Sequence, residues 1–122
     1  MEPRERALFT EFWEALLSLD ADEIASRFSA RGSVCFGNER PAQGRLAVRR
    51  EFVRLFSRTA AIRHRPVSLW ARDGVVVADA DLAFELDGDR HVEIPITTVC
   101  WFRNGGIDRC EFSFYPEPAL AD

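Results

Sequence analysis

Three strand-like runs between Val75 and Tyr115, joined by two glycine-containing turns, constrain the fold of this chain more than any other feature. Apolar and polar residues alternate along the first run, and a period of two is typical of a strand with one buried face. The apolar positions of that run are Val76, Ala78, Ala80, Leu82, Phe84 and Leu86. The last run has Cys110, Phe112 and Phe114 on one face. The pattern predicts a sheet with one continuously apolar face that curves around a core.

The middle run, from His91 to Phe102, is apolar on both faces after Pro95, which predicts a central strand covered on both sides. We place Thr97 on the inner face, where its hydroxyl can donate a hydrogen bond to a ligand; the alternative, which we favour, is a buried threonine that is hydrogen-bonded to its own sheet. The residues that we then expect on the outer face form an apolar ridge: Ile94, Ile96, Thr98, Cys100 and Phe102. Charged residues flank this ridge, so we predict a homodimer interface on the outer sheet face. The competing interpretation is that residues 116–122 fold over the ridge.

The first half of the chain is predicted to be mainly helical. A first helix has its apolar positions at the spacing of one helix face: Leu8, Phe9, Phe12, Trp13, Leu16 and Leu17. Asp20 or Asp22 is expected to cap a short second helix that buries Phe28 and ends at Gly32, before a strand at residues 34–36. A third helix is predicted from Arg45 to about residue 60 and a strand over 62–71. All of these elements are expected in one domain, residues 1–122.

Composition excludes several classes of function. The net charge of −4 argues against a nucleic-acid partner, which requires a positive surface. The chain has neither a run of about 18 apolar residues nor the hydrophobic stretch of a signal peptide, so we expect a cytoplasmic protein without membrane contact. All 16 basic residues are arginine, which excludes Schiff-base catalysis by lysine.

Metal and cofactor sites are not expected either. The 2 histidines are too few for a three-histidine metal site, and the sequence contains neither HExxH nor CxxC. Cys35, Cys100 and Cys110 lie in apolar patterns without metal-ligand spacing, so we interpret them as reduced core residues. No nucleotide-binding fingerprint occurs, and we predict no cofactor.

The order of the elements, with the segments GNERPAQGRLAVRREFVRLF and IPITTVCWFRNGGIDRCEFSFY, resembles the nuclear transport factor 2-like superfamily, nearest its SnoaL-like and ketosteroid isomerase-like branches. The resemblance implies an α+β fold, a cone-shaped α+β barrel in which three N-terminal helices pack in a strongly curved, mixed, mostly antiparallel sheet. It also implies a deep apolar pocket and a homodimer through the outer sheet face. The residues that we expect to line the pocket are Phe12, Leu16, Phe36, Phe52, Phe56, Ile62, Thr97, Cys110, Phe112 and Phe114.

The catalytic groups of these branches are missing at the matching positions. Ketosteroid isomerases use a tyrosine on the first helix, an aspartate base on the first strand and a protonated aspartate on the central strand. The corresponding positions here are Phe12, Phe36 and Thr97. Cyclases and epoxide hydrolases of this fold rely on an acidic residue late in the last strand, where this chain has Pro116. The resemblance therefore implies a binding protein without the standard isomerase chemistry.

His64 and Glu39 remain as candidate acid–base groups. His64 shares a strand face with Ile62, and histidine commonly transfers protons near neutral pH; the alternative is a histidine stacked in the sheet. Glu39 lies in the loop at the expected pocket mouth, where a desolvated carboxylate can act as a base; the alternative is a solvated loop residue. Arg63 and Arg65 are expected to form ion pairs across the sheet or across a dimer.

Three hypotheses follow for the function. The first is a SnoaL-like protein whose apolar pocket binds a hydrophobic small molecule, for example an aromatic, polyketide-like or terpenoid compound. The second is an isomerase, cyclase or dehydratase that uses a relocated acid–base residue, His64 or Glu39. The third is a non-catalytic domain that dimerises or binds a protein partner through its sheet. The sequence leaves open whether the protein is an enzyme.

Overall fold

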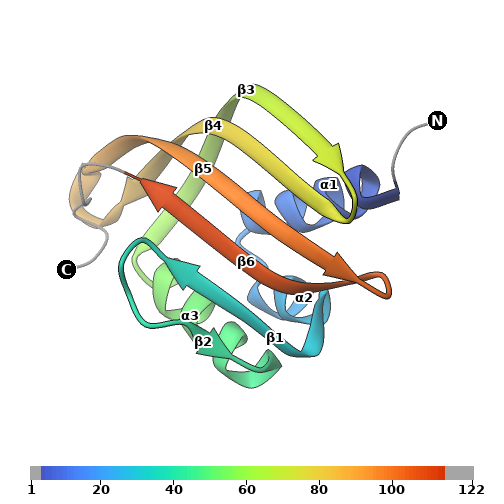
Figure 1. Ribbon diagram of the computed structural model, residues 1–122. Helices are drawn as coiled ribbons and strands as arrows, with labels where there is room; N and C mark the ends of the chain where they lie inside the picture. The colour runs from blue at the N-terminus through green and yellow to red at the C-terminus, as the bar shows by residue number, and fades with distance from the viewer. Residues whose placement is uncertain (1–3, 115–122) are drawn as a thin grey trace.

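The computed structural model describes residues 4–114, in which three helices cover one face of a curved six-stranded sheet (Figure 1). The helices are α1 (Arg4–Leu17), α2 (Ala21–Ser26) and α3 (Arg45–Phe56). The strands are β1 (Phe28–Phe36), β2 (Ala42–Gln43), β3 (Thr59–Arg72), β4 (Val75–Leu86), β5 (His91–Arg103) and β6 (Gly106–Phe114), and a single 3-10 turn, η1 (Asp87–Asp89), joins β4 to β5. The predicted α+β class is confirmed. Among residues 4–114, no helix has the length and apolar character needed to cross a membrane.

The sheet is mixed and mostly antiparallel, in the order β2-β1-β6-β5-β4-β3. The one parallel pair within residues 4–114 is β1 with β6. β5 lies between β4 and β6, so its predicted place in the interior of the sheet is confirmed. The turn between β5 and β6 has positive φ at both Asn104 (53°) and Gly105 (82°), the conformation of a tight hairpin whose twist matches that of the strands.

The helices bury the faces that their sequence periodicity predicts. On α1 the buried side chains include Phe9, Phe12 and Leu16. The side chain of Asp20 accepts a hydrogen bond from the Glu23 backbone N–H at 3.0 Å, so Asp20 is the N-cap of α2. α3 buries Val48 and Phe52 against the sheet.

Two predicted boundaries in this half are wrong. α2 ends at Ser26, and Phe28 begins β1 rather than closing the helix. Phe28 is opposite Ile107 of β6, so pairing with a distant strand replaces the local helical preference. The third helix ends at Phe56 instead of about residue 60, because Thr59 already belongs to β3.

Gly32 lies inside β1 and does not end a helix. A Cβ atom built at this position would lie 2.5 Å from the Ile107 carbonyl oxygen. The register of β1 against β6 is irregular between Phe28 and Ser33, so Gly32 sits where the two backbones approach most closely. A glycine is therefore required for the parallel pairing that attaches β1 and β2 to the rest of the sheet.

The faces of β5 are the reverse of those predicted. Ile94, Ile96, Thr98 and Cys100 are buried against the helices, whereas Pro95, Thr97, Val99 and Trp101 lie on the outer face. The expected outer ridge and the expected inward Thr97 are both wrong. Both alternating sets of β5 are largely apolar, so the strand's own pattern does not define its buried face. Pairing with β4 does, because Ile96 is opposite Ala80 on the buried face of β4.

We predict that Gly32→Ala lowers the free energy of unfolding by about 1–3 kcal/mol, because the new methyl group meets backbone and not a mobile side chain. Urea unfolding followed by circular dichroism measures the change. Ala30→Ser is the matched control, because Ala30 is exposed on the same strand and substitutions at such positions change stability by less than about 0.5 kcal/mol. Equal midpoints for the two variants would contradict the close approach of β1 and β6.

Candidate functional site

The space between the helices and the inner sheet face holds a cluster of phenylalanine rings. Phe36 of β1 stacks on Phe112 of β6, with ring centroids 5.2 Å apart and an interplanar angle of 8°. Phe52 of α3 contacts Phe36 at 5.5 Å and Phe56 at 5.8 Å, and Phe12 of α1 lies 6.4 Å from Phe112. These separations are typical of packed aromatic pairs. The cluster therefore joins α1, α3, β1 and β6 around one point of the core.

Burial differs between the two ends of this core. Val76, Ile107 and Cys110 are completely buried toward the end of the sheet where β4 and β6 begin. Phe36, Phe56 and Phe114 are only half-buried, at the other end, where β1, α3 and β6 finish. We call this second end the open end. Tyr115, Pro116 and Glu117 follow Phe114 and lie outside the described residues, as does the predicted covering segment 116–122.

Nine of the ten predicted pocket-lining residues belong to the core or pack against it. They are Phe12, Leu16, Phe36, Phe52, Phe56, Ile62, Cys110, Phe112 and Phe114. The tenth, Thr97, lies on the opposite face of the sheet. That these nine residues line an open pocket stays a prediction.

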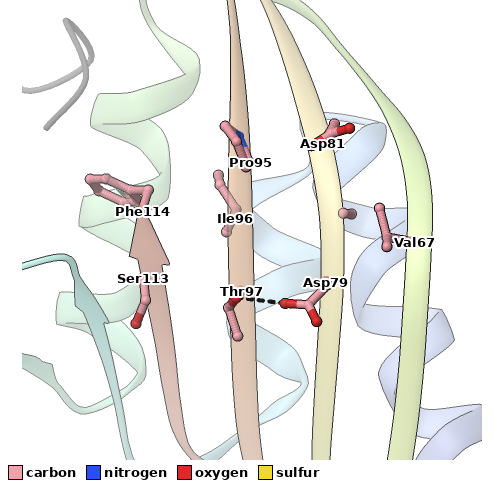
Figure 2. A pocket seen from close by; sticks show the side chains of 9 residues that line it. Val67, Asp79, Asp81, Pro95, Ile96, Thr97, Ser113 and Phe114 are labelled. Atoms are coloured by element: carbon pink, nitrogen blue, oxygen red, sulfur yellow. Dashed lines mark hydrogen bonds between the residues drawn. The ribbon is translucent and has the colours of Figure 1, made fainter. Parts of the chain in front are cut away.

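Two adjacent threonines on β5 have opposite environments. The Thr97 hydroxyl donates a hydrogen bond to the Asp79 carboxylate at 2.6 Å on the outer face (Figure 2). Thr98 is completely buried, and its Oγ1 has no hydrogen-bond partner among the described residues. Thr98 lies between Ala78 of β4 and Phe112 of β6 in the sheet. Its hydroxyl, and not that of Thr97, therefore faces the core. In the sequence, Asp79 and Thr97 lie the same number of residues before and after Gly88. A hairpin centred on Gly88 therefore predicts that Asp79 and Thr97 are opposite each other on neighbouring strands.

His64 is an exposed residue of the edge strand β3. Its Nδ1 accepts a hydrogen bond from Trp13 Nε1 of α1 at 2.6 Å, and the two rings stack with centroids 6.1 Å apart. A neutral imidazole that accepts at Nδ1 carries its proton at Nε2. The contact ties α1 to the edge of the sheet, which favours the interpretation of His64 as a stacked histidine. Sequence reasoning missed the Trp13 contact, because the two residues are 51 positions apart.

Glu39 is exposed in the loop that follows β1. Its carboxylate lies 3.7 Å from Arg54 Nη2 of α3, and its backbone carbonyl accepts a hydrogen bond from the Cys35 thiol at 3.1 Å. Among the described residues, no hydrogen bond or ion pair joins Glu39 to His64. The structure thus places the two candidates on separate elements with separate partners, and it does not bring them together as an acid–base pair.

The outer sheet face combines apolar and charged side chains. We call its apolar part the outer patch, and it consists of Trp70, Val75, Val77, Val99 and Trp101. Trp70 is 52% exposed, and the guanidinium of Arg109 lies 5.0 Å from the centre of the Trp101 ring. Next to the outer patch is an open groove of about 510 Å³, whose lining includes Val67, Asp81, Pro95 and Ser113 (Figure 2).

The predicted ion pairs of the outer face occur within one chain. Arg65 pairs with Asp81, and an Arg63 guanidinium nitrogen lies 3.6 Å from a Glu85 carboxylate oxygen. Both pairs join β3 to β4. The prediction of ion pairs across the sheet is confirmed. Because the arginine side chains are largely exposed, each pair contributes little to stability.

Comparison of the whole chain with known proteins identifies the fold. The sequence matches no model of a protein family. It also matches no curated protein. Among solved structures, a protein with a ketosteroid isomerase-like fold from Catenulispora acidiphila, in complex with trimethylamine, is similar over 99% of this chain and 92% of its own, with a TM-score of 0.83 and 15% identity.

Two further structures agree with this result. SalBIII, an epoxide hydrolase/cyclase-like enzyme with a role in pyran ring formation in the polyether salinomycin, has a TM-score of 0.82 and 18% identity over 93% of this chain and 92% of its own. A SnoaL-like protein from Jannaschia sp. CCS1 has a TM-score of 0.78 and 13% identity over 94% of this chain and 90% of its own. This chain has the nuclear transport factor 2-like fold.

The sequence resemblance matches Phe12, Phe36 and Thr97 to the catalytic positions of ketosteroid isomerases, and this correspondence stays a prediction. Phe12 is completely buried in the aromatic cluster, and Phe36 is half-buried at the open end. Thr97, matched to the third catalytic position, faces outward, so the inward residue of this part of β5 is Thr98. The three matched positions are thus two phenylalanines of the core and an outward threonine, and the buried hydroxyl on this part of β5 belongs to Thr98.

We predict opposite effects for the two threonines when each is replaced by valine. Thr98→Val removes a buried hydroxyl without a partner and should raise the free energy of unfolding by about 1 kcal/mol. Thr97→Val removes the bond to Asp79 and should lower it by about 1 kcal/mol. Urea unfolding of both variants measures the difference. If Thr97→Val were the stabilising change, the assigned faces of β5 would be wrong.

Proposed function

We propose that this protein binds a hydrophobic small molecule at the open end of its aromatic core. The observation that carries the proposal is the half-burial of three phenylalanine rings, Phe36, Phe56 and Phe114, which come from three different elements and meet at one end of the core. Sites for small molecules are mostly apolar and have few polar groups. Partly exposed aromatic rings on three different elements match that description, and aromatic, polyketide-like and terpenoid compounds are the ligand classes that we expect.

Two neighbours of the same fold support a small organic ligand. The protein from Catenulispora acidiphila is in complex with trimethylamine, and SalBIII has its role in the formation of a pyran ring. From these two neighbours we take only the class of ligand, a small organic molecule. Because phenylalanine rings line the open end of this chain, we favour a larger hydrophobic molecule.

Binding is favoured over catalysis because neither candidate base is held in an apolar site. His64 and Glu39 are both exposed, and each has a partner of its own in Trp13 and Arg54. A general base has to lie within hydrogen-bond reach of the proton that it removes. The open end provides aromatic surface, but the described residues provide no acid–base pair beside it. Catalysis by a relocated residue therefore stays an alternative without a supporting contact.

Phe56→Asp should weaken ligand binding by about tenfold or more, because a carboxylate at the open end has to be desolvated when an apolar molecule binds. Leu46→Asp is the matched control: it introduces the same charge on the same helix at a site that is 69% exposed. Fluorescence titration with anilinonaphthalene sulfonate measures the affinity, and mass spectrometry of solvent extracts identifies compounds that copurify with the wild-type protein. Equal affinities of the two folded variants would contradict a site at the open end.

We also propose that two copies of the chain associate through the outer patch. The exposed Trp70 and the half-buried remainder of the outer patch, with Arg72 opposite Val75 and Arg109 opposite Trp101, form an apolar centre with a charged edge. That arrangement is typical of protein interfaces, and a symmetric dimer brings the same patch of both copies together. The outer patch replaces the ridge at Ile94–Phe102, whose members are mostly buried in the core. A cytoplasmic location stays a prediction.

Val99→Asp should convert a dimer into a folded monomer, because the new charge would be buried at the centre of the interface. Val53→Asp, on an exposed face of α3, should leave the dimer intact. Ile96→Asp places the same charge in the core and should prevent folding. Sedimentation velocity measures the mass, and circular dichroism measures folding. A monomeric wild-type protein would refute the dimer and leave the open-end site untouched.

A further inference from the structure

Cys100 and Cys110 face each other inside the core. They are direct cross-strand partners in the antiparallel pair of β5 and β6. Their sulfur atoms are 3.5 Å apart, and both residues are completely buried free thiols. Val76 of β4 and Val34 of β1 complete the same row across the inner face of the sheet. The two thiols are therefore held together by the backbone register, and their side chains are enclosed by apolar residues.

This geometry is close to that of a disulfide. Directly opposed residues of antiparallel strands have Cα atoms about 4.5–5.5 Å apart, within the range of about 4.4–6.8 Å found for disulfides. Their Cβ atoms, about 4.5–5.5 Å apart, have to approach slightly to reach the disulfide range of about 3.5–4.5 Å. The sulfur atoms have to approach by about 1.5 Å, from 3.5 Å to the length of a sulfur–sulfur bond. Rotation about the two Cα–Cβ bonds and a slight approach of the strands provide that change. The register of the sheet does not have to change.

We propose that Cys100 and Cys110 form an oxidative modification site, at which a peroxide converts the thiol pair into an intramolecular disulfide. The sulfur of one cysteine attacks hydrogen peroxide, the O–O bond breaks, and a sulfenic acid and one water form. The second thiol then attacks the sulfenic sulfur, the S–S bond forms, and the hydroxyl leaves with the thiol proton as a second water. Two thiols lose two electrons in all, and one peroxide is reduced to two waters.

Burial controls the rate of this reaction. Desolvation raises the pKa of the Cys110 thiol well above its ordinary value, and the neighbouring Cys100 raises this pKa further. The reactive thiolate is therefore scarce while the core is closed. Oxidation should be slow in the folded protein and should follow small openings between β5 and β6. Once one sulfur has reacted, the second is already in contact with it, so the disulfide forms faster than further oxidation.

Cys35 does not belong to this site. It is opposite Glu111 in the pairing of β1 with β6, and Glu111 is on the outer face, whereas Cys110 faces the core. The Cys35 thiol donates to the Glu39 backbone carbonyl at 3.1 Å. Cys35 is half-buried, so it is the thiol most accessible to reagents and has to be removed from the experiment.

The test uses the Cys35→Ser variant of the full chain, folded and treated with hydrogen peroxide. We expect its intact mass to fall by about 2 Da, the mass of two hydrogens, and the number of thiols alkylated after denaturation to fall from two to none. Trypsin should then release peptide 91–103 linked to peptide 110–122, because arginines at 90, 103 and 109 border them. Dithiothreitol should restore both thiols.

Two variants in the same background serve as controls. Cys35→Ser/Cys100→Ser and Cys35→Ser/Cys110→Ser should show no loss of mass, and their urea midpoints should not change with peroxide. The midpoint of the parent Cys35→Ser protein should rise on oxidation, because a cross-link restricts the unfolded chain. Two alkylatable thiols after treatment, or only oxygen additions to the mass, would overturn the proposal. If either double variant does not fold, the intact mass and the tryptic peptides of the Cys35→Ser protein are sufficient to test whether the disulfide forms.

Discussion

The hydrogen-bond register of β5 against its two neighbours is the constraint on which the rest of the structure depends. One face of β4 is apolar along its whole length, whereas the other carries Asp79, Asp81 and Glu85, so the position of its buried face is set by the hydrophobic effect. β5 is apolar on both faces and takes its orientation from the pairing of Ala80 with Ile96. A shift by one residue would exchange all inner and outer side chains of the strand. Such a shift would move Thr97 away from Asp79 and would place Trp101 on the face that packs against the helices.

The same register contributes to the outer patch and creates the buried thiol pair. On the outer face it places Val99 opposite Val77, and the pairing of β3 with β4 adds Trp70 to the same row. On the inner face it opposes Cys100 to Cys110 and leaves the Thr98 hydroxyl among apolar neighbours. The thiol pair and the outer patch are therefore not independent features. A central strand with two apolar faces contributes one face to the core and the other to a surface that is available for association.

The open end of the core depends on a second long-range contact, the parallel pairing of β1 with β6. Gly32 allows the two backbones to approach, and β1 then carries Phe36 to the ring of Phe112. α3 packs Phe52 against both rings. Because β1, β6 and α3 all finish at the same end, their last aromatic side chains meet there and are only half-buried. The shape of the fold, more than any single polar group, makes this end the candidate binding site.

The sequence by itself determined the elements whose signals are local. The helical period of α1, an aspartate cap at position 20 or 22 for α2, the alternation of β4 and β6 and the glycine-containing turn between β5 and β6 were all predicted, and with them the α+β class. Only the tertiary structure decided which face of β5 is buried, that Phe28 starts a strand, and that His64 contacts Trp13. A local pattern reflects neighbours within a few residues, whereas these three outcomes depend on partners that the folded chain brings together from distant positions. The apolar residues on both faces of β5 could have filled the core equally well, and strand pairing made the choice.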